Sequence, residues 1–151
     1  GNVKIDIFPA YNVKKEYHPK SEGWIGFVIK MGKFIIYHAG DTDIIPEMQK
    51  LSVYGKHENT LISLLPVSGN YVMDADEAAE VASTLRPDLA IPMHYGAGVA
   101  GTVEDAERFV ELCKQKKINA EIFLSTYCQC NAHGGSLHPR STFGKYRHVG
   151  P

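Results

Sequence analysis

Three short stretches of the sequence place histidine and carboxylate groups where they could bind a metal ion. They are "YHPK" with His18, "YHAGDTD" with His38 and Asp41, and "PMHYG" with His94. Histidine nitrogens combined with a carboxylate oxygen suit Zn²⁺, Mn²⁺ or Fe²⁺, and for zinc the ligand distances are about 2.0–2.2 Å. If the loops that carry these residues leave one edge of a sheet, the side chains converge there and predict a metal site.

Each of these residues also has a simpler interpretation when it is taken alone. A single histidine in a loop is usually a surface or capping group. Asp41 could be a turn residue, and Asp43 could be the N-cap of a short helix that extends to Leu51. The neighbouring Gly40 and Gly96 allow sharp turns that bring the backbone close to a ligand.

The three cysteines give little support to a disulfide framework, since their number is odd. Cys113 lies on the apolar face of an expected helix, which favours core packing. Cys128, Cys130 and His133 form a C-x-C-x-x-H pattern without a fourth partner, a weak metal motif. From Cys128 onward the apolar periodicity stops. We therefore expect a domain over residues 1–127 and an irregular tail over 128–151.

The overall composition predicts a single cytoplasmic globular domain. The chain has 151 residues, with 16 basic and 17 acidic side chains. This balance argues against binding to nucleic acid or to an anionic membrane surface. No apolar run approaches the roughly 18 residues that would span a bilayer, and the first residues do not resemble a secretion leader.

The pattern of apolar residues predicts the strands. The alternation of Val3, Ile5 and Ile7 indicates a half-buried strand that ends at Pro9, and residues 24–38 read as a hairpin around Gly32. The short apolar runs "TLISLLP" (60–66) and "DLAIPMHYG" (88–96) are typical of buried strands, the first of them buried on both faces. The alternating stretch "INAEIFLST" (118–126) predicts a last strand.

Two helices have clear start signals. Asp74 and Glu77 have the spacing of a capping box, and Pro87 stops the helix that follows. Thr102 caps the second helix, with Asp105 three residues later. The predicted buried stripe of this second helix contains Val103, Ala106, Phe109, Val110 and Cys113. The alternation of strands and helices from residue 60 to 126 predicts an α/β layer with helices on one face of a sheet.

Four segments in order, "FPAYNVKKEYHPKSEGWIGFVI", "FIIYHAGDTDIIPEM", "LLPVSGNYVMDADEAAE" and "IPMHYGAGVAGTVEDAERF", carry a resemblance to a known family. Together they resemble the metallo-β-lactamase-fold metal-dependent hydrolases, and most of all the branch of L-ascorbate-6-phosphate lactonase-like proteins. The resemblance runs from about residue 3 to 126. It implies the C-terminal half of an αββα sandwich, with one mixed sheet and helices on one of its faces.

The resemblance also implies the roles of the candidate residues. His18 matches a ligand of a first metal ion, Asp41 matches the carboxylate that bridges two ions, and His94 matches a ligand of the second. His38 would act with Asp41 in catalysis by orienting it or the substrate. One or two Zn²⁺ ions, or Mn²⁺ or Fe²⁺, would then activate a water that attacks an ester, lactone, amide or phosphodiester of a small molecule.

One departure from the family pattern limits this expectation. The family's H-x-H-x-D-H signature is missing, which leaves two protein ligands per ion where a zinc site usually has at least three. We therefore expect a half-domain that is inactive alone, or completed by a homodimer with facing sheets or by a separate N-terminal half. A single ion held by His18, Asp41 and His94 is an intermediate possibility. The alternative function is a non-enzymatic assembly or binding module with relic ligands.

Overall fold

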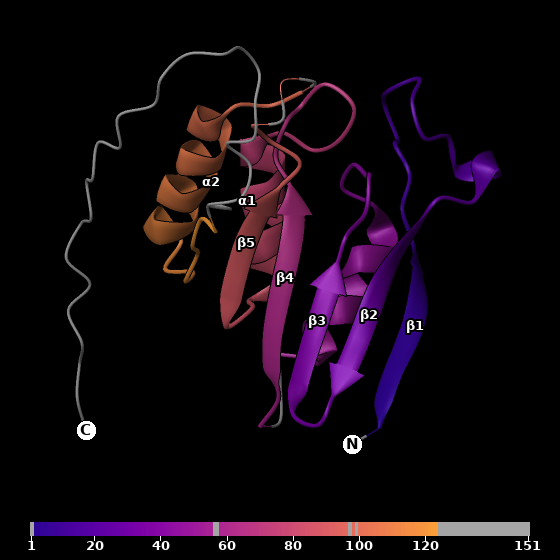
Figure 1. Ribbon diagram of the computed structural model, residues 1–151, viewed down its shortest axis with the longest axis vertical. Helices are drawn as coiled ribbons and strands as arrows, with labels where there is room; N and C mark the ends of the chain where they lie inside the picture. The colour runs from indigo at the N-terminus through magenta and orange to yellow at the C-terminus, as the bar shows by residue number, and fades with distance from the viewer. Residues whose placement is uncertain (1, 56–57, 97, 99, 124–151) are drawn as a thin grey trace, which may run out of the picture.

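The structure, a computed structural model, contains one five-stranded mixed sheet (Figure 1), and residues 2–55, 58–96, 98 and 100–123 are described below. The strands are β1 (Val3–Pro9), β2 (Ile25–Met31), β3 (Phe34–His38), β4 (Thr60–Pro66) and β5 (Leu89–Met93), and they lie side by side in chain order. The β1–β2 and β2–β3 pairs are antiparallel, whereas the β3–β4 and β4–β5 pairs are parallel. The predicted hairpin is therefore confirmed, as is the α/β class with one mixed sheet.

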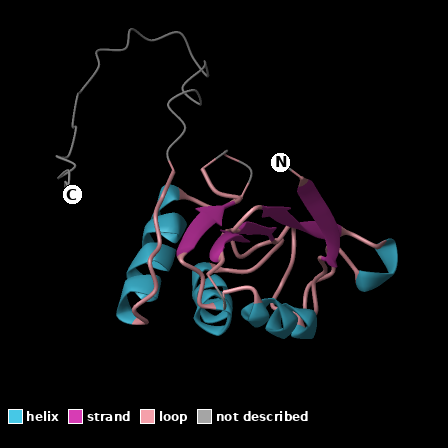
Figure 2. Cartoon of the chain, turned by 90° about the horizontal axis from the view of Figure 1, so that it is seen from below, coloured by secondary structure: helices cyan, strands magenta, loops and turns pink. Residues whose placement is uncertain are grey.

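Two α-helices and one long 3₁₀ helix lie on the same side of this sheet. They are α1 (Ala75–Leu85), α2 (Val103–Gln115) and the 3₁₀ helix η2 (Pro46–Val53). Figure 2 shows η2 and α1 below the sheet and α2 at its left end, next to α1. A second 3₁₀ helix, η1 (Lys20–Glu22), belongs to the loop after β1. No described helix is long and apolar enough to cross a membrane.

Both predicted helix starts are confirmed as capping boxes. At α1, the Asp74 carboxylate accepts a hydrogen bond from the Glu77 amide at 2.8 Å, and Glu77 accepts one from the Asp74 amide at 3.1 Å. At α2, Thr102 and Asp105 make the equivalent pair. Both signals lie within four residues of chain, so local chemistry alone satisfies the free amides of the first helical turn.

The core lies between the sheet and the helices. The helix-facing side of the sheet contributes large apolar side chains, and α1 meets it with an alanine-rich face that allows close approach. The buried members of this core include Val28, Ile35, Tyr37, Leu61, Leu65, Ala78, Ala82, Phe109 and Cys113. Cys113 is fully buried, and burial raises the pKa of its thiol to about 11. The predicted core role of Cys113 is thus confirmed.

The opposite face of the sheet is also apolar, and no described helix or strand covers it (Figure 2). Side chains that pair across neighbouring strands point to the same face, so the strand register divides this face into three rows. The rows are Val3, Met31, Phe34 and Thr60; Ile5, Ile29, Ile36, Ile62 and Leu89; and Ile7, Phe27, His38, Leu64 and Ile91. We call these three rows the open face.

The open face corrects the sequence prediction for three strands. Val3, Ile5 and Ile7 belong to a strand as predicted, but they are more than half exposed because they lie on the uncovered side of an edge strand. In β4 and β5, alternate side chains are buried against the helices and the others are only half-buried. A continuous apolar run therefore did not mean burial on both faces here.

Three further sequence predictions were wrong. The predicted last strand is not formed over residues 118–123. There Ala120 makes only an isolated β-bridge to Ala90 instead of pairing over several residues. Asp43 caps no helix, because η2 starts at Pro46 after Ile45. On α2, Val103 is exposed. Its side chain is 41% exposed and does not belong to the core cluster. Cys128, Cys130 and His133 lie outside the described residues.

Tyr37→Phe is expected to leave the protein as stable as the original or to stabilise it by about 1 kcal/mol. The Tyr37 ring is fully buried, and its hydroxyl has no hydrogen-bond partner among the described residues. Burial raises the pKa of this phenol, so it stays neutral at ordinary pH. Urea unfolding of the two proteins measures the difference. A loss above about 1 kcal/mol would mean that the hydroxyl has a partner in solution.

Candidate metal centre at the carboxyl edge of the sheet

The directions of the strands bring four loops to one edge of the sheet. β1 and β3 both run antiparallel to β2, and β4 and β5 run parallel to β3. β1, β3, β4 and β5 therefore end at the same edge, which is the upper edge in Figure 1. The loops that follow them carry His18, Asp41, Tyr71 and His94. The convergence that the sequence predicted for these loops depends on this shared direction.

Asp41 lies between the two predicted histidine ligands. Its Oδ2 atom is 3.6 Å from Nε2 of His18, and its Oδ1 atom is 3.8 Å from Nε2 of His94. Each carboxylate oxygen thus faces a different imidazole. The Asp41 side chain is 42% exposed, so its remaining lone pairs are open to a ligand. The structure therefore brings together the three residues proposed as metal ligands.

Both histidines are oriented by a partner on the other ring nitrogen. Nδ1 of His18 is 3.2 Å from the carbonyl oxygen of Tyr71, which can only accept, so Nδ1 carries the proton. In the neutral ring, the lone pair is then on Nε2, the atom that faces Asp41. Nδ1 of His94 is 2.9 Å from the hydroxyl of Ser68. Partners of this kind fix the ring orientation of metal-binding histidines in known sites.

The backbone at both histidines is left-handed. The φ angles are 51° at His18 and 61° at His94, values that cost energy for residues with a side chain and that concentrate at functional sites. The Asn12 amide donates to the His18 carbonyl at 2.9 Å. A Cβ on Gly101 would lie 2.6 Å from the Ser68 Cβ and 2.9 Å from the His94 carbonyl oxygen. The surrounding loops therefore hold both strained residues tightly.

The geometry of these donors fits divalent metal ions, with two protein ligands for each. Two ligands on one tetrahedral zinc ion lie about 3.3–3.5 Å apart, given bond lengths of about 2.0–2.2 Å. The two histidine–carboxylate separations exceed this range by only a few tenths of an ångström. Within the described residues, no three His, Cys, Asp or Glu side chains lie close enough to hold one ion. Each Asp41 oxygen therefore has one imidazole nitrogen as its neighbour, rather than all three side chains surrounding one point.

His38 acts on this centre through the turn that follows it. Its Nδ1 atom accepts a hydrogen bond from the Gly40 amide at 3.2 Å, so in the neutral ring Nε2 carries the proton and has no free lone pair. Gly40 has φ 69°, and a Cβ there would lie 2.7 Å from the carbonyl oxygen of Ile25. His38 and Gly40 therefore fix the turn that presents Asp41. No direct contact between His38 and Asp41 is among the described interactions.

Asp43 has a role that the sequence did not predict, and its carboxylate is only 4% exposed. Its Oδ2 atom accepts hydrogen bonds from the amides of Val13 at 3.0 Å and Lys14 at 3.4 Å, and its Oδ1 atom pairs with the Lys15 ammonium. These partners lie about thirty residues away, in the loop that leads to His18. Asp43 therefore anchors the loop of one ligand to the turn of another.

Asp43→Asn is expected to weaken metal binding about 10-fold or more without removing a ligand. The substitution removes the charge that pairs with Lys15, so the 13–15 backbone is held less firmly and His18 is less well placed. Isothermal titration with Zn²⁺ measures the change. Asp105→Asn, at the exposed start of α2, is the matched control and should bind as the original does. Equal affinity in Asp43→Asn would show that the loop keeps its position without this anchor.

A second contact holds the outer part of the same loop. Glu47 of η2 accepts hydrogen bonds from Lys20 Nζ and Tyr11 Oη, both at 2.9 Å. These bonds lower the pKa of Glu47 to about 2, and the bond from Lys20 has the largest effect. Because this pKa is below its usual value, the stabilisation by ionised Glu47 is complete above about pH 4.5 and is lost as the pH falls toward 2.

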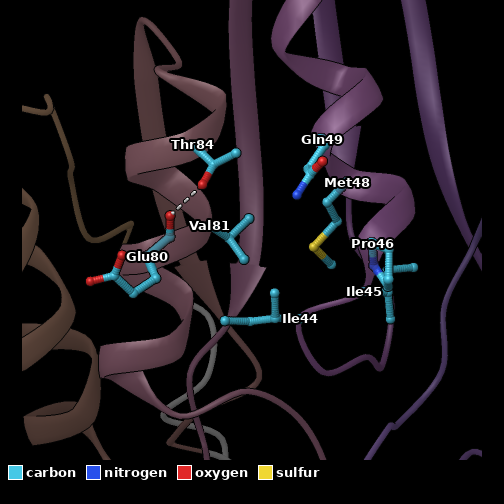
Figure 3. A pocket seen from close by; sticks show the side chains of 8 residues that line it. All are labelled: Ile44, Ile45, Pro46, Met48, Gln49, Glu80, Val81 and Thr84. Atoms are coloured by element: carbon cyan, nitrogen blue, oxygen red, sulfur yellow. Dashed lines mark hydrogen bonds between the residues drawn. The ribbon is translucent and has the colours of Figure 1, made fainter.

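The hollows on the helical side of the protein lie away from this centre. The one between η2 and α1 has a volume of about 290 Å³ and is lined mainly by Ile44, Ile45, Met48 and Val81, as Figure 3 shows. Neither His18, Asp41 nor His94 lines it. The convergent polar groups at the carboxyl edge of the sheet are therefore separate from this hollow.

Comparison with known proteins shows the family of this chain. A model of the beta-lactamase superfamily domain matches residues 1–94, which include both histidines and Asp41. The chain belongs to the beta-lactamase superfamily. Relatives of the chain within the superfamily include a UPF0173 metal-dependent hydrolase of Hyperthermus butylicus, which is 34% identical over 126 residues, 82% of this chain and 50% of that protein.

Solved structures of the superfamily show the metallo-β-lactamase fold of this chain. A protein of Parabacteroides distasonis, described as a metal-dependent hydrolase, superposes with a TM-score of 0.63 at 29% identity, over 80% of this chain and 50% of that one. Igni18, a metallo hydrolase of the archaeon Ignicoccus hospitalis, has a TM-score of 0.60 at 25% identity, over 80% and 49% of the two chains. The chain thus spans no more than about half the length of these proteins.

Proposed function

We propose that this chain carries half of the metal centre of a metal-dependent hydrolase, with Asp41 as the bridging ligand and His18 and His94 as one ligand each. The observation that carries the proposal is the pairing of the two Asp41 oxygens with two different Nε2 atoms, at 3.6 and 3.8 Å. The similarity to proteins named metal-dependent hydrolases supports the same assignment.

The residues of the chain would have separate tasks in this reaction. Asp41 would balance the charge of both ions, and the Tyr71 carbonyl and the Ser68 hydroxyl would hold the imidazoles of His18 and His94 in place. His38 would keep the turn of Asp41 closed through the Gly40 amide. When bound, Zn²⁺ or Mn²⁺ supplies Lewis acidity and a water that is activated at neutral pH. The substrates we propose are small esters, lactones, amides or phosphodiesters. Among these four classes, we propose a lactone most specifically.

The centre needs further ligands from outside the described residues. His18 and Asp41 would hold one ion and Asp41 and His94 the other, which is two protein ligands each, whereas catalytic zinc sites usually have three. We propose that a partner subunit or a separate half-domain supplies the others. The same observation favours the alternative function, a non-enzymatic assembly or binding module whose ligand residues are relics.

A direct test compares hydrolysis before and after metal loading. The chelator-treated chain is reloaded with Zn²⁺ or Mn²⁺ and assayed with p-nitrophenyl acetate, a γ-lactone and bis-p-nitrophenyl phosphate. We expect metal binding by the chain, and metal-stimulated hydrolysis where a second copy or a partner completes the ligand set; both should weaken in His94→Ala and be kept in Asp76→Asn, whose carboxylate pairs with Arg108 on the helical side. Metal binding without turnover would support the binding-module alternative or an absent partner. No metal binding would contradict the proposal.

A further inference from the structure

The two edges of the sheet differ in the backbone groups that they leave unpaired. At the β5 edge, the Ala90 amide donates to the Asn119 carbonyl at 2.9 Å, and the Ala90 carbonyl accepts from the Glu121 amide at 3.0 Å. The next residue of β5 that faces outward is Pro92, which has no N–H to donate. At the opposite edge, no described strand lies beside β1 (Figure 1). β1 is therefore the edge of the described sheet that can still accept a strand.

The backbone hydrogen bonds of β1 show which of its groups face outward. In an antiparallel pair of strands, only every second pair of opposite residues exchanges hydrogen bonds. The Ala10 amide donates at 3.0 Å to the carbonyl of Trp24, the residue opposite it in the register. By the same register, the even-numbered residues of β1 bond to β2, and Val3, Ile5 and Ile7 direct their N–H and C=O groups away from it. These three residues thus offer backbone donors and acceptors at the edge.

β1 lacks most of the features that block an exposed edge strand, which are a proline, a bulge or charged side chains within the strand. Its proline, Pro9, is the last residue of the strand, and its one-to-one register with β2 contains no bulge. The three outward residues are β-branched, which favours strand pairing, and their side chains are more than half exposed. The remaining obstacle is the charge of Lys4 and Asp6, which are exposed on the side of β1 away from the open face.

These two charges favour one pairing register with a second copy of β1. A twofold antiparallel pair in which at least two of the three outward residues face each other can be centred on Lys4, Ile5 or Asp6. Centred on Lys4 or on Asp6, the pair places two like charges directly opposite each other, which is destabilising. Centred on Ile5, it uses all three outward residues, with Val3 opposite Ile7, and it places Lys4 of each copy opposite Asp6 of the other. Charge complementarity therefore favours a second β1 as the occupant of this edge.

We propose that β1 pairs antiparallel with β1 of a second copy around a twofold axis at Ile5, so that the two five-stranded sheets become one continuous sheet. Three opposite pairs then each exchange two backbone hydrogen bonds. Asp6, which already accepts from Lys30 at 2.7 Å, also meets Lys4 of the other copy. A contact between single strands buries less area than most stable complexes, so the dimer is weak and reversible. It depends on β1 alone, so it goes beyond the proposed function and is testable on the metal-free chain.

Sedimentation velocity of the full, chelator-treated chain over a range of micromolar concentrations tests the proposal. We expect a species of twice the 16.7 kDa chain mass whose fraction rises with concentration. Ile5→Pro removes the central N–H from both copies and should weaken the dimer about 30-fold or more. This N–H points away from β2, so the fold should tolerate the proline, as circular dichroism would verify. Ile5→Thr is the matched control. It keeps the N–H and a β-branched side chain, so its dimer should have nearly the original affinity.

A charge exchange tests the register itself. Lys4→Glu and Asp6→Lys, made separately, each place like charges opposite each other at two positions and should weaken the dimer about 10-fold. In an equimolar mixture of the two variants, the new carboxylate faces the new ammonium, and the unchanged Asp6 faces the unchanged Lys4. The mixture should therefore dimerise as the original chain does. Recovery in the mixture also shows that both variants are folded.

Several results would overturn the proposal. A monomer at every micromolar concentration would show that β1 does not pair with itself, even if it then accepted a strand of a different protein. A dimer of unchanged affinity in Ile5→Pro would place the interface elsewhere. Charge variants that dimerise alone, or a mixture that does not recover, would contradict the register centred on Ile5. An open series of larger species would rule out a closed twofold pair.

Discussion

Asp41→Ala is expected to abolish the binding of both metal ions, with affinity reduced well beyond the roughly 10- to 100-fold that loss of an orienting partner causes. The reason is the position of the carboxylate between two imidazoles, one facing each oxygen. If Asp41 bridges two ions, His18→Ala and His94→Ala should each remove mainly one of them. Elemental mass spectrometry of the reloaded proteins gives the stoichiometry, and isothermal titration gives the affinities.

The matched control for this experiment is Asp76→Ala. Asp76 is also an exposed carboxylate, but it forms a bidentate pair with Arg108, 2.7 and 2.9 Å from the guanidinium nitrogens. Its loss should leave the metal content unchanged. If Asp41→Ala kept the metal content of the original chain, the ions would have to bind elsewhere, and the cysteines near residue 128 would become the next candidates. Equal loss of all metal in His18→Ala would argue for one shared ion.

Phe109→Ala should destabilise the fold by about 3–5 kcal/mol, the usual cost of removing a buried aromatic ring. Phe109 is fully buried in the middle of α2, and the cavity left by its ring would be lined by residues of α1 and the sheet that cannot easily close it. Because small domains are stable by only about 5–15 kcal/mol, this change removes a large part of the total. Urea or thermal unfolding measures it.

Val103→Ala on the same helix is the control. Val103 is 41% exposed, so truncation should cost no more than about 0.5 kcal/mol. The sequence pattern predicted that Phe109 and Val103 both lie on one buried stripe. The difference between the losses of unfolding free energy in the two variants tests whether only Phe109 is buried in solution. A large loss in Val103→Ala would mean that the start of α2 is covered by a part of the chain or a partner beyond the described residues.

The features that were predictable from the sequence are those that local chemistry determines. The capping boxes at Asp74 and Thr102 depend on residues three positions apart, and the hairpin depends on a short turn between two apolar runs. Burial was predicted less well, because it depends on what covers each face. Ile5 was predicted to lie on the buried face of an alternating strand, yet its side chain is 61% exposed because no described element covers that face.

The candidate site divides in the same way. His18, Asp41 and His94 could be chosen from residue type and family resemblance, and the strand directions bring them together. The groups that orient these three side chains could not be predicted from the sequence. The Tyr71 carbonyl belongs to the backbone, which carries no residue-specific signal, and nothing in the sequence distinguishes Ser68 from the other seven serines. Asp43 was taken for a helix cap because its true partners, the amides of Val13 and Lys14, lie far away in the sequence.

Asp41 and Asp43 are two residues apart on one turn, and this spacing affects the dynamics of the site. A fluctuation that opens the turn displaces the Asp41 carboxylate and releases the anchored 13–15 loop in the same event. The turn and the loop that carries His18 therefore belong to one cooperative opening unit. Asp41 and His18 thus leave their positions together when this short turn opens, rather than one after the other.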